Sequence, residues 1–253
     1  MSSIGTGYDL SASQFSPDGR VFQVDYASKA VEKSGTVIGL RGKDGVVLAV
    51  EKIVTSSLYE ESAGARIYTI DKNIGLVLAG LLADGRYIVQ VARNEAQNYR
   101  TQFERTIPLK TLNERLSAYI HAYTLYSAVR PFGVSIILSS WDEDVGPQLY
   151  KIEPSGSSFG YYGCASGKAK QQAKTEIEKL NIKDMTTEEL IKNAGKIIYS
   201  VHDELKDKDF RLELSLVGKE TNGMHKISPV PWYDMAVEAG QAAKREDDSD
   251  NEI

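Results

Sequence analysis

Three histidines are the side chains best suited to metal binding or proton transfer, and they lie far apart in the sequence. His121, His202 and His225 show neither the two-turn spacing nor the Cys-x-x-Cys companions of common metal sites. His202 precedes Asp203 and Glu204, and we expect it to lie on a solvated helix face. The spacing argues against a bound metal ion, and we expect no cofactor.

The run from Gly163 to Ala169 contains a second set of candidate groups. It resembles a phosphate-binding loop, but the spacing before Gly167 and Lys168 is one residue short, and Ala169 replaces the hydroxyl side chain that such a loop requires. Cys164 is the only cysteine and lies among aromatic and small residues. We expect it to be a packed core thiol and not a reactive one.

Composition favours one domain with two tails. The chain has 253 residues, of which 42% are hydrophobic, so it can bury one substantial core. It shows no leader sequence and no long apolar span, and we expect a soluble, intracellular protein. Five of the 35 acidic residues follow Arg245, which leaves 30 acidic residues against 30 basic ones in the body. Because the body has no net charge, we expect neither nucleic acid nor a membrane as partner.

The hydrophobic pattern indicates the elements that must position these groups. Apolar runs predict strands at residues 36–40, 46–50, 74–82, 134–138, 148–152, 159–164 and 212–216, with a hairpin turn at 221–223. Helical spacing predicts helices at residues 84–99, 109–127, 168–180 and 187–205, and Thr186 with Glu189 forms a capping box for the last. The order of these strands and helices along the chain suits two sheets packed face to face with helices outside, although the hydrophobic pattern alone does not select this arrangement.

The first 35 residues form an appendage ahead of these elements. Pro17 fixes one backbone angle of a tight turn, and Asp18 and Gly19 supply the rest of its chemistry. Apolar residues then recur at helical spacing from Val21 to Val31. The pattern predicts a helix with one apolar face, which by itself would most simply pack on its own domain.

This segment resembles the N-terminal signature of proteasome alpha-type subunits, in which Tyr-Asp is followed by Phe-Ser-Pro-x-Gly-Arg and then by Gln-Val-Glu-Tyr-Ala. The three pieces occupy residues 8–9, 15–20 and 23–27, with Asp25 where Glu is usual. The resemblance continues at residues 45–48, 80–84, 130–134, 153–156 and 216–218, so it covers nearly the whole chain.

The resemblance implies an α+β fold. It is the four-layer αββα sandwich of two antiparallel sheets found in amino-terminal-nucleophile hydrolases, with an additional N-terminal helix. We accordingly expect a gate segment and signature helix at residues 1–35, a sandwich domain at 36–231, and a C-terminal helix with an acidic tail at 232–253.

Thr36, which follows Gly35, is the sharpest enzymatic hypothesis that the resemblance offers. Catalytic relatives are cut just before such a threonine, and the freed α-amino group, with a pKa of about 7.7 to 8.0, takes the hydroxyl proton. Here 35 residues precede Thr36, and Glu51 and Arg66 fall, by spacing, where catalytic relatives carry Asp and Lys. Arginine stays charged and cannot exchange a proton usefully. We therefore expect no catalytic residue; the alternative is a processed hydrolase that acts alone through Thr36.

The resemblance also gives the appendage a role. In the family, the N-terminal segments of seven related subunits converge on the ring axis and block access to the proteolytic chamber. Tyr8, Asp9, Pro17 and Tyr26 match the cluster that organises the open form of this gate. Leu10 departs from the common Tyr-Asp-Arg pattern, so the charged contact of that arginine is absent. The alternative is a mobile terminus without such a role.

Arg66 and Gly80 match a second family site, an inter-subunit pocket for regulatory-particle tails. There a lysine usually receives the terminal carboxylate of the tail, and an arginine can pair with a carboxylate in a fork geometry. Gly80 matches the pocket wall and would permit close backbone approach. The alternative is an ordinary surface arginine and a strand glycine.

The acidic tail offers a candidate modification site. Ser249 is followed by Asp250 and Glu252, which resembles a substrate of an acidophilic kinase. A phosphate would add about −1.5 to −2 charges to a segment that we expect to be disordered. An unmodified, solubilising tail is the alternative.

Together these features imply a noncatalytic alpha-ring subunit of the 20S proteasome core particle, with roles in ring assembly, gating and activator docking during ubiquitin-dependent and ubiquitin-independent protein degradation. The expected partners are six other alpha subunits, beta-ring subunits, regulatory particles such as the ATPase cap, and unfolded protein substrates. The expected location is cytoplasm and nucleus. A third hypothesis is a free interaction protein that uses its acidic tail.

Overall fold

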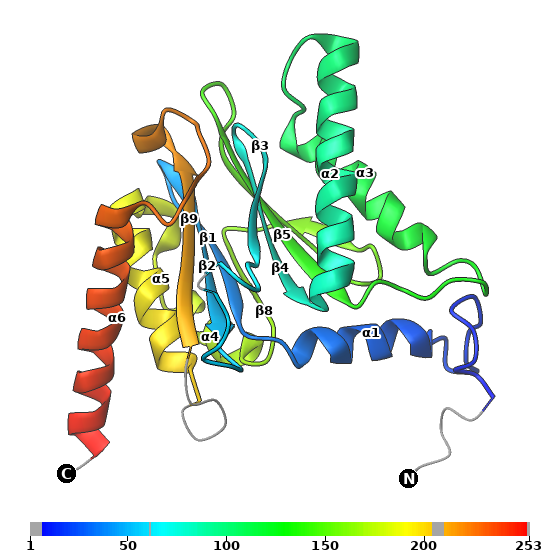
Figure 1. Cartoon of the computed structure of the whole chain (residues 1–253), viewed down its shortest axis with the longest axis horizontal. Coiled ribbons are helices and arrows are strands. Elements are labelled where there is room, and N and C mark those ends of the chain that lie inside the picture. Colours follow the sequence, from blue (N-terminus) through cyan, green and yellow to red (C-terminus); the bar gives the residue numbers. More distant parts are fainter. Residues whose placement is uncertain (1–6, 61, 204–209, 252–253) are drawn as a thin grey trace.

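The computed structural model describes residues 7–60, 62–203 and 210–251, with side chains as far as Arg245. Two five-stranded antiparallel sheets lie face to face, and helices cover the outer face of each (Figure 1). This arrangement confirms the predicted four-layer αββα sandwich of the α+β class. Within the described ranges, every helix is too short or too polar to cross a membrane.

The first sheet contains a hairpin formed by the two strands that the sequence predicts at residues 36–40 and 46–50. Its strand order is β10-β9-β2-β1-β8, and the residues from Val37 to Leu40 and from Gly45 to Glu51 are buried. These central strands are covered on both faces, by helices and by the second sheet, which explains their nearly continuous apolar runs. The bounds are β1 (Val37–Arg41), β2 (Gly45–Ile53), β8 (Gly163–Ser166), β9 (Phe210–Gly218) and β10 (Lys226–Ile227).

The second sheet has the order β3-β4-β5-β6-β7. The apolar run at residues 74–82 ends as a strand at Gly80, and the run at 159–164 is two short strands in different sheets, because the chain crosses between the sheets there. The unpredicted strand β3 lies at the sheet edge and is only partly buried, so its apolar pattern is weak. The bounds are β3 (Ile67–Asp71), β4 (Ile74–Gly80), β5 (Val134–Asp142), β6 (Gly146–Ile152) and β7 (Ser158–Gly160).

The helices form the two outer layers. Helices α2 (Leu82–Phe103) and α3 (Leu109–Ala122) cover the second sheet, whereas α4 (Lys170–Glu178), α5 (Thr187–Val201) and α6 (Val230–Asn251) cover the first (Figure 1). Three buried apolar clusters fill the spaces between the four layers. Representative members are Ile88 and Leu112 on the second sheet, Leu190 and Ala236 on the first, and Leu48 and Ile137 between the sheets.

Helix α5 begins at the predicted capping box. The Glu189 amide donates to Thr186 Oγ1 at 3.3 Å, and the Thr186 amide donates to Glu189 Oε2 at 2.7 Å. The helix ends at Val201, earlier than the predicted residue 205, which lies outside the described residues.

Helix α6 continues into the acidic tail. Its backbone is helical as far as Asn251, so the prediction of a disordered tail is wrong for these residues. The helix is already anchored on α5, where Gly195 leaves no space for a Cβ atom beside the Ala236 carbonyl. Because extending an existing helix is far easier than nucleating one, the helix formers at residues 241–246 carry it onward.

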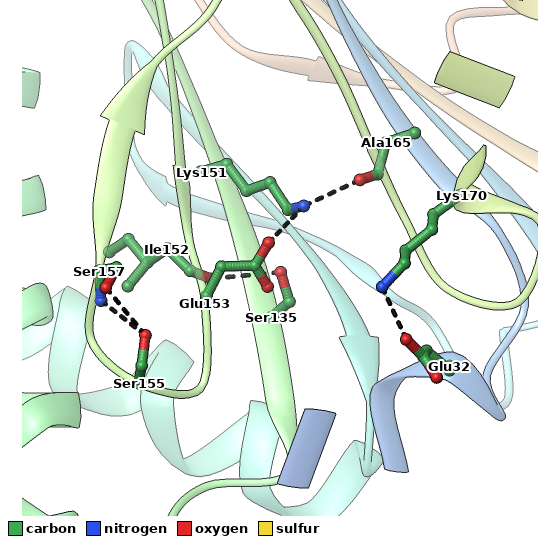
Figure 2. Close-up of polar contacts among 9 residues, drawn as sticks. All are labelled: Glu32, Ser135, Lys151, Ile152, Glu153, Ser155, Ser157, Ala165 and Lys170. Carbon is green, nitrogen blue, oxygen red and sulfur yellow. Dashed lines mark hydrogen bonds and ion pairs between the residues drawn. The ribbon is translucent and has the colours of Figure 1, made fainter. Parts of the chain in front are cut away.

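Helix α1 (Phe22–Glu32) is the predicted N-terminal helix, and it lies along one edge of the sandwich (Figure 1). Phe22, Ala27 and Val31 form its buried face. Figure 2 shows the ion pair between Glu32 Oε1 and Lys170 Nζ, 2.7 Å long, that joins its last turn to α4.

A lysine also connects the two sheets at this edge. Lys151 reaches from β6 to β8, where its Nζ donates to the Ala165 carbonyl at 2.9 Å, and it pairs with Glu153 on its own sheet (Figure 2). The mostly buried Lys151 side chain thus joins the two sheets by a hydrogen bond.

Candidate functional sites

Thr36 lies directly before β1 and is fully buried. Its amide N–H donates to Glu51 Oε2 at 2.9 Å, and its Oγ1 accepts a hydrogen bond of 3.3 Å from the Ala169 amide. In the part of the chain that the structure describes, no side-chain base contacts this hydroxyl. The described contacts therefore hold the Thr36 backbone in place and include no base that could activate Oγ1.

Glu51 is the centre of a buried charge network. Its carboxylate is fully buried and lies 3.1 Å from Lys168 Nζ and 2.7 Å from His202 Nδ1, in addition to the Thr36 amide. The prediction that His202 decorates a solvated helix face is wrong, since its side chain is 3% exposed. Because α5 ends at Val201, the extended backbone of His202 lets the imidazole turn inward toward Glu51.

Arg66 does not join this network. Lys168 is the cation beside Glu51, whereas Arg66 Nη1 donates to the Gly80 carbonyl at 2.9 Å and the Arg66 amide donates to Glu213 Oε2 at 2.9 Å. Arg66 and Gly80, which the sequence analysis paired in a docking site, are therefore in direct contact. Burial lowers the pKa of Arg66, and the nearby Glu213 offsets part of that effect.

Arg66 lines a surface pocket of about 530 Å³ near the end of α1. The pocket wall contains four basic side chains, Lys33, Lys52, Arg66 and Arg211, and the carboxylate of Glu60. It also includes Ser34 and Gly35, the residues just before the buried threonine. Lys52 Nζ pairs with Glu213 Oε1 at 3.2 Å, so part of this positive charge is compensated within the chain, and the Arg66 guanidinium is the group that suits an anionic ligand.

Gly80 has a conformation that only glycine adopts easily. Its φ angle is +116°, and a Cβ atom added there would lie 2.2 Å from the Gly133 carbonyl oxygen. The Gly80 amide donates to Ser34 Oγ at 2.9 Å. The sequence analysis missed Ser34, because a serine outside any motif gives no signal of a partner 46 residues away.

The N-terminal segment is held against α1 at Asp9. Tyr26 Oη donates to Asp9 Oδ2 at 3.2 Å, and Gln23 Nε2 donates to the Asp9 carbonyl. Burial and the neighbouring Asp9 raise the pKa of Tyr26. The structure thus brings together two of the four predicted gate residues and adds Gln23, which the family wording contains but which the sequence analysis did not select.

The other two predicted gate residues lie on either side of this contact. Tyr8 is 37% exposed, and Pro17 lies in a tight turn closed by the Gly19 amide, which donates to the Ser16 carbonyl at 2.9 Å. Leu10 is 85% exposed. Asp25, which replaces the usual Glu, pairs with Arg20 at 2.6 Å.

The remaining candidates of the sequence analysis lie elsewhere. Cys164 is a buried core thiol, as predicted, and burial raises its pKa to about 12. His225 is buried with Nδ1 2.8 Å from Thr69 Oγ1, and burial lowers its pKa to about 4. Among the described residues, no three acidic, histidine or cysteine side chains cluster as metal ligands. Ser249 lies in α6, and its side chain is outside the described part.

Comparison with known proteins places these features in a family. A family profile described as proteasome subunit matches residues 31–217, and a profile for the N-terminal signature of A-type proteasome subunits matches residues 8–30. The chain is 71% identical over 252 residues to proteasome subunit alpha type-3 of Drosophila melanogaster, covering 100% of this chain and 99% of that protein. It is 55% identical over 251 residues to proteasome subunit alpha type-3 of Acanthamoeba castellanii, covering 99% of both chains.

A more distant relative agrees over the same length. The chain is 47% identical over 252 residues to the probable proteasome subunit alpha type-7 of Saccharomyces cerevisiae, covering 98% of this chain and 87% of that protein. The two-sheet sandwich and the profile over residues 31–217 define the class, a proteasome subunit. The signature at residues 8–30 and the full-length relatives narrow it further: the chain belongs to the proteasome alpha-subunit family.

Proposed function

We propose that this chain is a noncatalytic alpha-ring subunit of the 20S proteasome core particle. The observation that carries the proposal is Thr36, which lies inside the chain with its amide bound by Glu51. A threonine hydroxyl is a weak nucleophile unless a base takes its proton, and an acylated amide nitrogen cannot serve as that base. Hydrolysis would then belong to other subunits of the particle.

The N-terminal segment forms part of the gate in this proposal. The contacts of Tyr26 and Gln23 with Asp9 join this part of the segment to α1, which supports a fixed starting point for the residues before it. Tyr8 and Pro17 would complete the cluster that organises the open form. The exposed Leu10 carries no charge, so this subunit would contribute less to gate contacts than relatives with an arginine.

The pocket around Arg66 and Gly80 would receive the C-terminal carboxylate of a regulatory-particle tail. Support comes from the basic wall of the cavity and from the planar guanidinium, which can donate two parallel hydrogen bonds to one carboxylate. In the assembled ring the neighbouring subunit would supply the opposite wall.

The proposed partners are six other alpha subunits, the beta ring, regulatory particles including the ATPase cap, and unfolded substrates in ubiquitin-dependent and ubiquitin-independent degradation. We place the particle in cytoplasm and nucleus. Phosphorylation of Ser249 would add charge at the end of α6 and alter contact with a basic partner.

Native mass spectrometry of the protein isolated from its cells tests this proposal. The expected result is a large particle of related chains in which this chain retains residues before Thr36. A monomer or small oligomer that begins at Thr36 would instead support the processed hydrolase, and a large unassembled pool would support a free interaction protein.

A further inference from the structure

Three tyrosines and a phenylalanine form an aromatic cluster at the contact between α2 and α3, which none of the roles above involves. Tyr87 lies on α2, Tyr119 lies on α3, and Tyr123 directly follows α3. The ring centroids of Tyr119 and Tyr123 are 5.4 Å apart, and those of Tyr87 and Tyr119 are 6.4 Å apart. Phe132 packs against all three rings, at 4.4 Å from the nearest, that of Tyr123. The cluster therefore holds three phenol groups beside one another.

The hydroxyl groups of these tyrosines form a chain of hydrogen bonds with one direction. Tyr119 Oη donates to Tyr87 Oη at 3.0 Å, and Tyr123 Oη lies 3.2 Å from Tyr119 Oη. A phenol has a single hydrogen to donate, and Tyr87 accepts that of Tyr119, so Tyr123 is the donor in the second contact. Both bonds thus point toward Tyr87, which is 51% exposed, whereas Tyr119 and Tyr123 are partly buried against the core.

The middle phenol of this chain keeps its proton. Burial raises the pKa of Tyr119, and the hydrogen bonds with Tyr123 and Tyr87 raise it further. Between two hydrogen-bonded phenols, a proton and an electron can move together as a hydrogen atom. When Tyr87 loses an electron to an oxidant and its proton to water, the Tyr119 O–H is already aimed at the resulting radical oxygen. The arrangement therefore favours transfer of the radical from the exposed ring to the buried ones.

We propose that these tyrosines form a site of oxidative modification, at which a one-electron oxidant that reacts with Tyr87 produces a covalent cross-link between Tyr119 and Tyr123. The oxidant is a small radical such as the carbonate radical anion. It takes one electron from Tyr87, and water takes the phenol proton. A hydrogen atom then passes from Tyr119 to Tyr87, and another passes from Tyr123 to Tyr119. The radical is left on Tyr123.

A second oxidation of Tyr87 completes the cross-link. Tyr119 again restores the hydrogen of Tyr87, so radicals now lie on both Tyr119 and Tyr123. One ring carbon beside each phenol oxygen joins the other in a carbon–carbon bond, and the hydrogens on those two carbons move to the oxygens. In total the protein loses two electrons to the oxidant and two protons to water, and Tyr87 is regenerated. Tyr119 and Tyr123 couple because they lie one helical turn apart and closer together than Tyr87 and Tyr119.

Light-driven oxidation of the assembled particle tests this proposal. The probe is ruthenium tris(bipyridine) with persulfate, which supplies a one-electron oxidant during a brief flash. Trypsin does not cut before a proline, so the bond after Arg130 stays intact and all residues from 116 to 151 remain in one peptide. Mass spectrometry of this peptide detects the loss of two hydrogens, and its fragments locate the bond between the two tyrosines.

Three substitutions separate the relay from general oxidation. Particles carry the natural chain, Tyr87→Phe, Tyr123→Phe or Tyr126→Phe. Each substitution keeps the aromatic ring and removes one hydroxyl, so the packing of the ring remains. Tyr126 is the matched control, because it is more exposed than Tyr87, at 63%, and lies in the same peptide as Tyr119 without joining the hydroxyl chain.

In the natural chain and in Tyr126→Phe, we expect the peptide to lose two hydrogens and to carry the bond between Tyr119 and Tyr123. The product should be lost in Tyr123→Phe and strongly reduced in Tyr87→Phe, which lacks the hydroxyl that starts the relay. A yield in Tyr87→Phe equal to that of the natural chain would overturn the relay. Absence of the bond in the natural chain, or a bond to another tyrosine or another subunit in its place, would overturn the cross-link itself.

Discussion

The buried threonine centre and the Arg66 pocket are neighbours in the chain, yet their charged groups are arranged in opposite ways. Thr36 is fully buried. The neighbouring Glu51 carboxylate accepts a hydrogen bond from the Thr36 amide and contacts the side chains of Lys168 and His202. One residue earlier, Gly35 lines a pocket with four basic side chains and one carboxylate. In the first region the charged groups contact one another in the interior, whereas the second region is a surface pocket that the Arg66 guanidinium lines.

The contrast separates two uses of charge. A buried carboxylate surrounded by donors holds β2, the end of α5 and the loop before α4 together. A cation that faces a cavity can bind an anion and change its own contacts as it does so. The region that resembles a catalytic centre therefore supports the fold, and the region beside it carries the proposed function.

The largest expected effect lies in the closed region. Glu51→Gln keeps the shape of the side chain but leaves Lys168 and His202 beside a neutral group, which should lower the free energy of unfolding by about 3–5 kcal/mol. Urea unfolding of the full chain measures the loss. Glu188→Gln, which removes an exposed ion pair with Lys192, is the matched control and should change stability little. Equal effects of the two substitutions would show that the buried network around Glu51 stabilises the fold no more than an exposed ion pair does.

Gly80→Ala tests the rigidity at the boundary of the open region. Its positive φ angle and the contact with the Gly133 carbonyl should together make the substitution cost about 3–4 kcal/mol. Gly64→Ala is the control, because Gly64 also has a positive φ angle but has no heavy atom near its Cβ position. Thermal unfolding should show a clearly larger loss for Gly80→Ala. A smaller loss than for Gly64→Ala would mean that Gly80 can move freely.

His225 extends the comparison to a buried group that lacks a charge partner. Burial holds its pKa at about 4, below its ordinary value of 6.5, so the unfolded chain binds the proton more tightly. The contribution of neutral His225 to the free energy of unfolding is complete above about pH 6.5. It decreases by about 3 kcal/mol in all as the pH falls toward 4.

Urea unfolding between pH 4.5 and 7 measures how the free energy of unfolding depends on pH. The slope of this free energy against pH should be smaller in His225→Asn than in the natural chain. The substitution His121→Asn at an exposed position should leave the slope as it is in the natural chain. An unchanged slope in His225→Asn would assign the pH dependence to other groups.

The smallest effect is expected at the N-terminal segment. Tyr26→Phe removes the hydrogen bond to Asp9 while Gln23 still holds the backbone, so hydrogen exchange in residues 8–14 should accelerate only roughly fivefold. Tyr59→Phe, at the pocket rim, should leave exchange in this segment unchanged. A segment that exchanges at the unprotected rate in the natural chain would show that Asp9 is not held at all.

Much of the fold could be predicted because its signals are local. The capping box of α5 needs only residues three apart, and β1 and β2 are apolar because both of their faces are covered. Short contacts and continuous burial leave a pattern in the sequence, which is why these elements were found close to their true bounds.

The site depends on contacts that sequence periodicity does not record. His202 meets Glu51 across 151 positions, and its acidic neighbours in the sequence pointed instead to a solvated face. Ser34 meets Gly80 across 46 positions without any motif. The pairing of Arg66 with Gly80 came from family resemblance and not from residue pattern, since only the fold brings β3 and the end of β4 together.

The central claim is that the buried Thr36 does not act as a nucleophile and that the chain is not cut before it. Intact-mass spectrometry of this chain, taken from native particles treated with a threonine-directed covalent inhibitor, tests it directly. We predict a chain that retains the residues before Thr36 and carries no inhibitor, while other subunits of the particle are labelled. A chain that begins at Thr36 and carries the inhibitor would contradict the account.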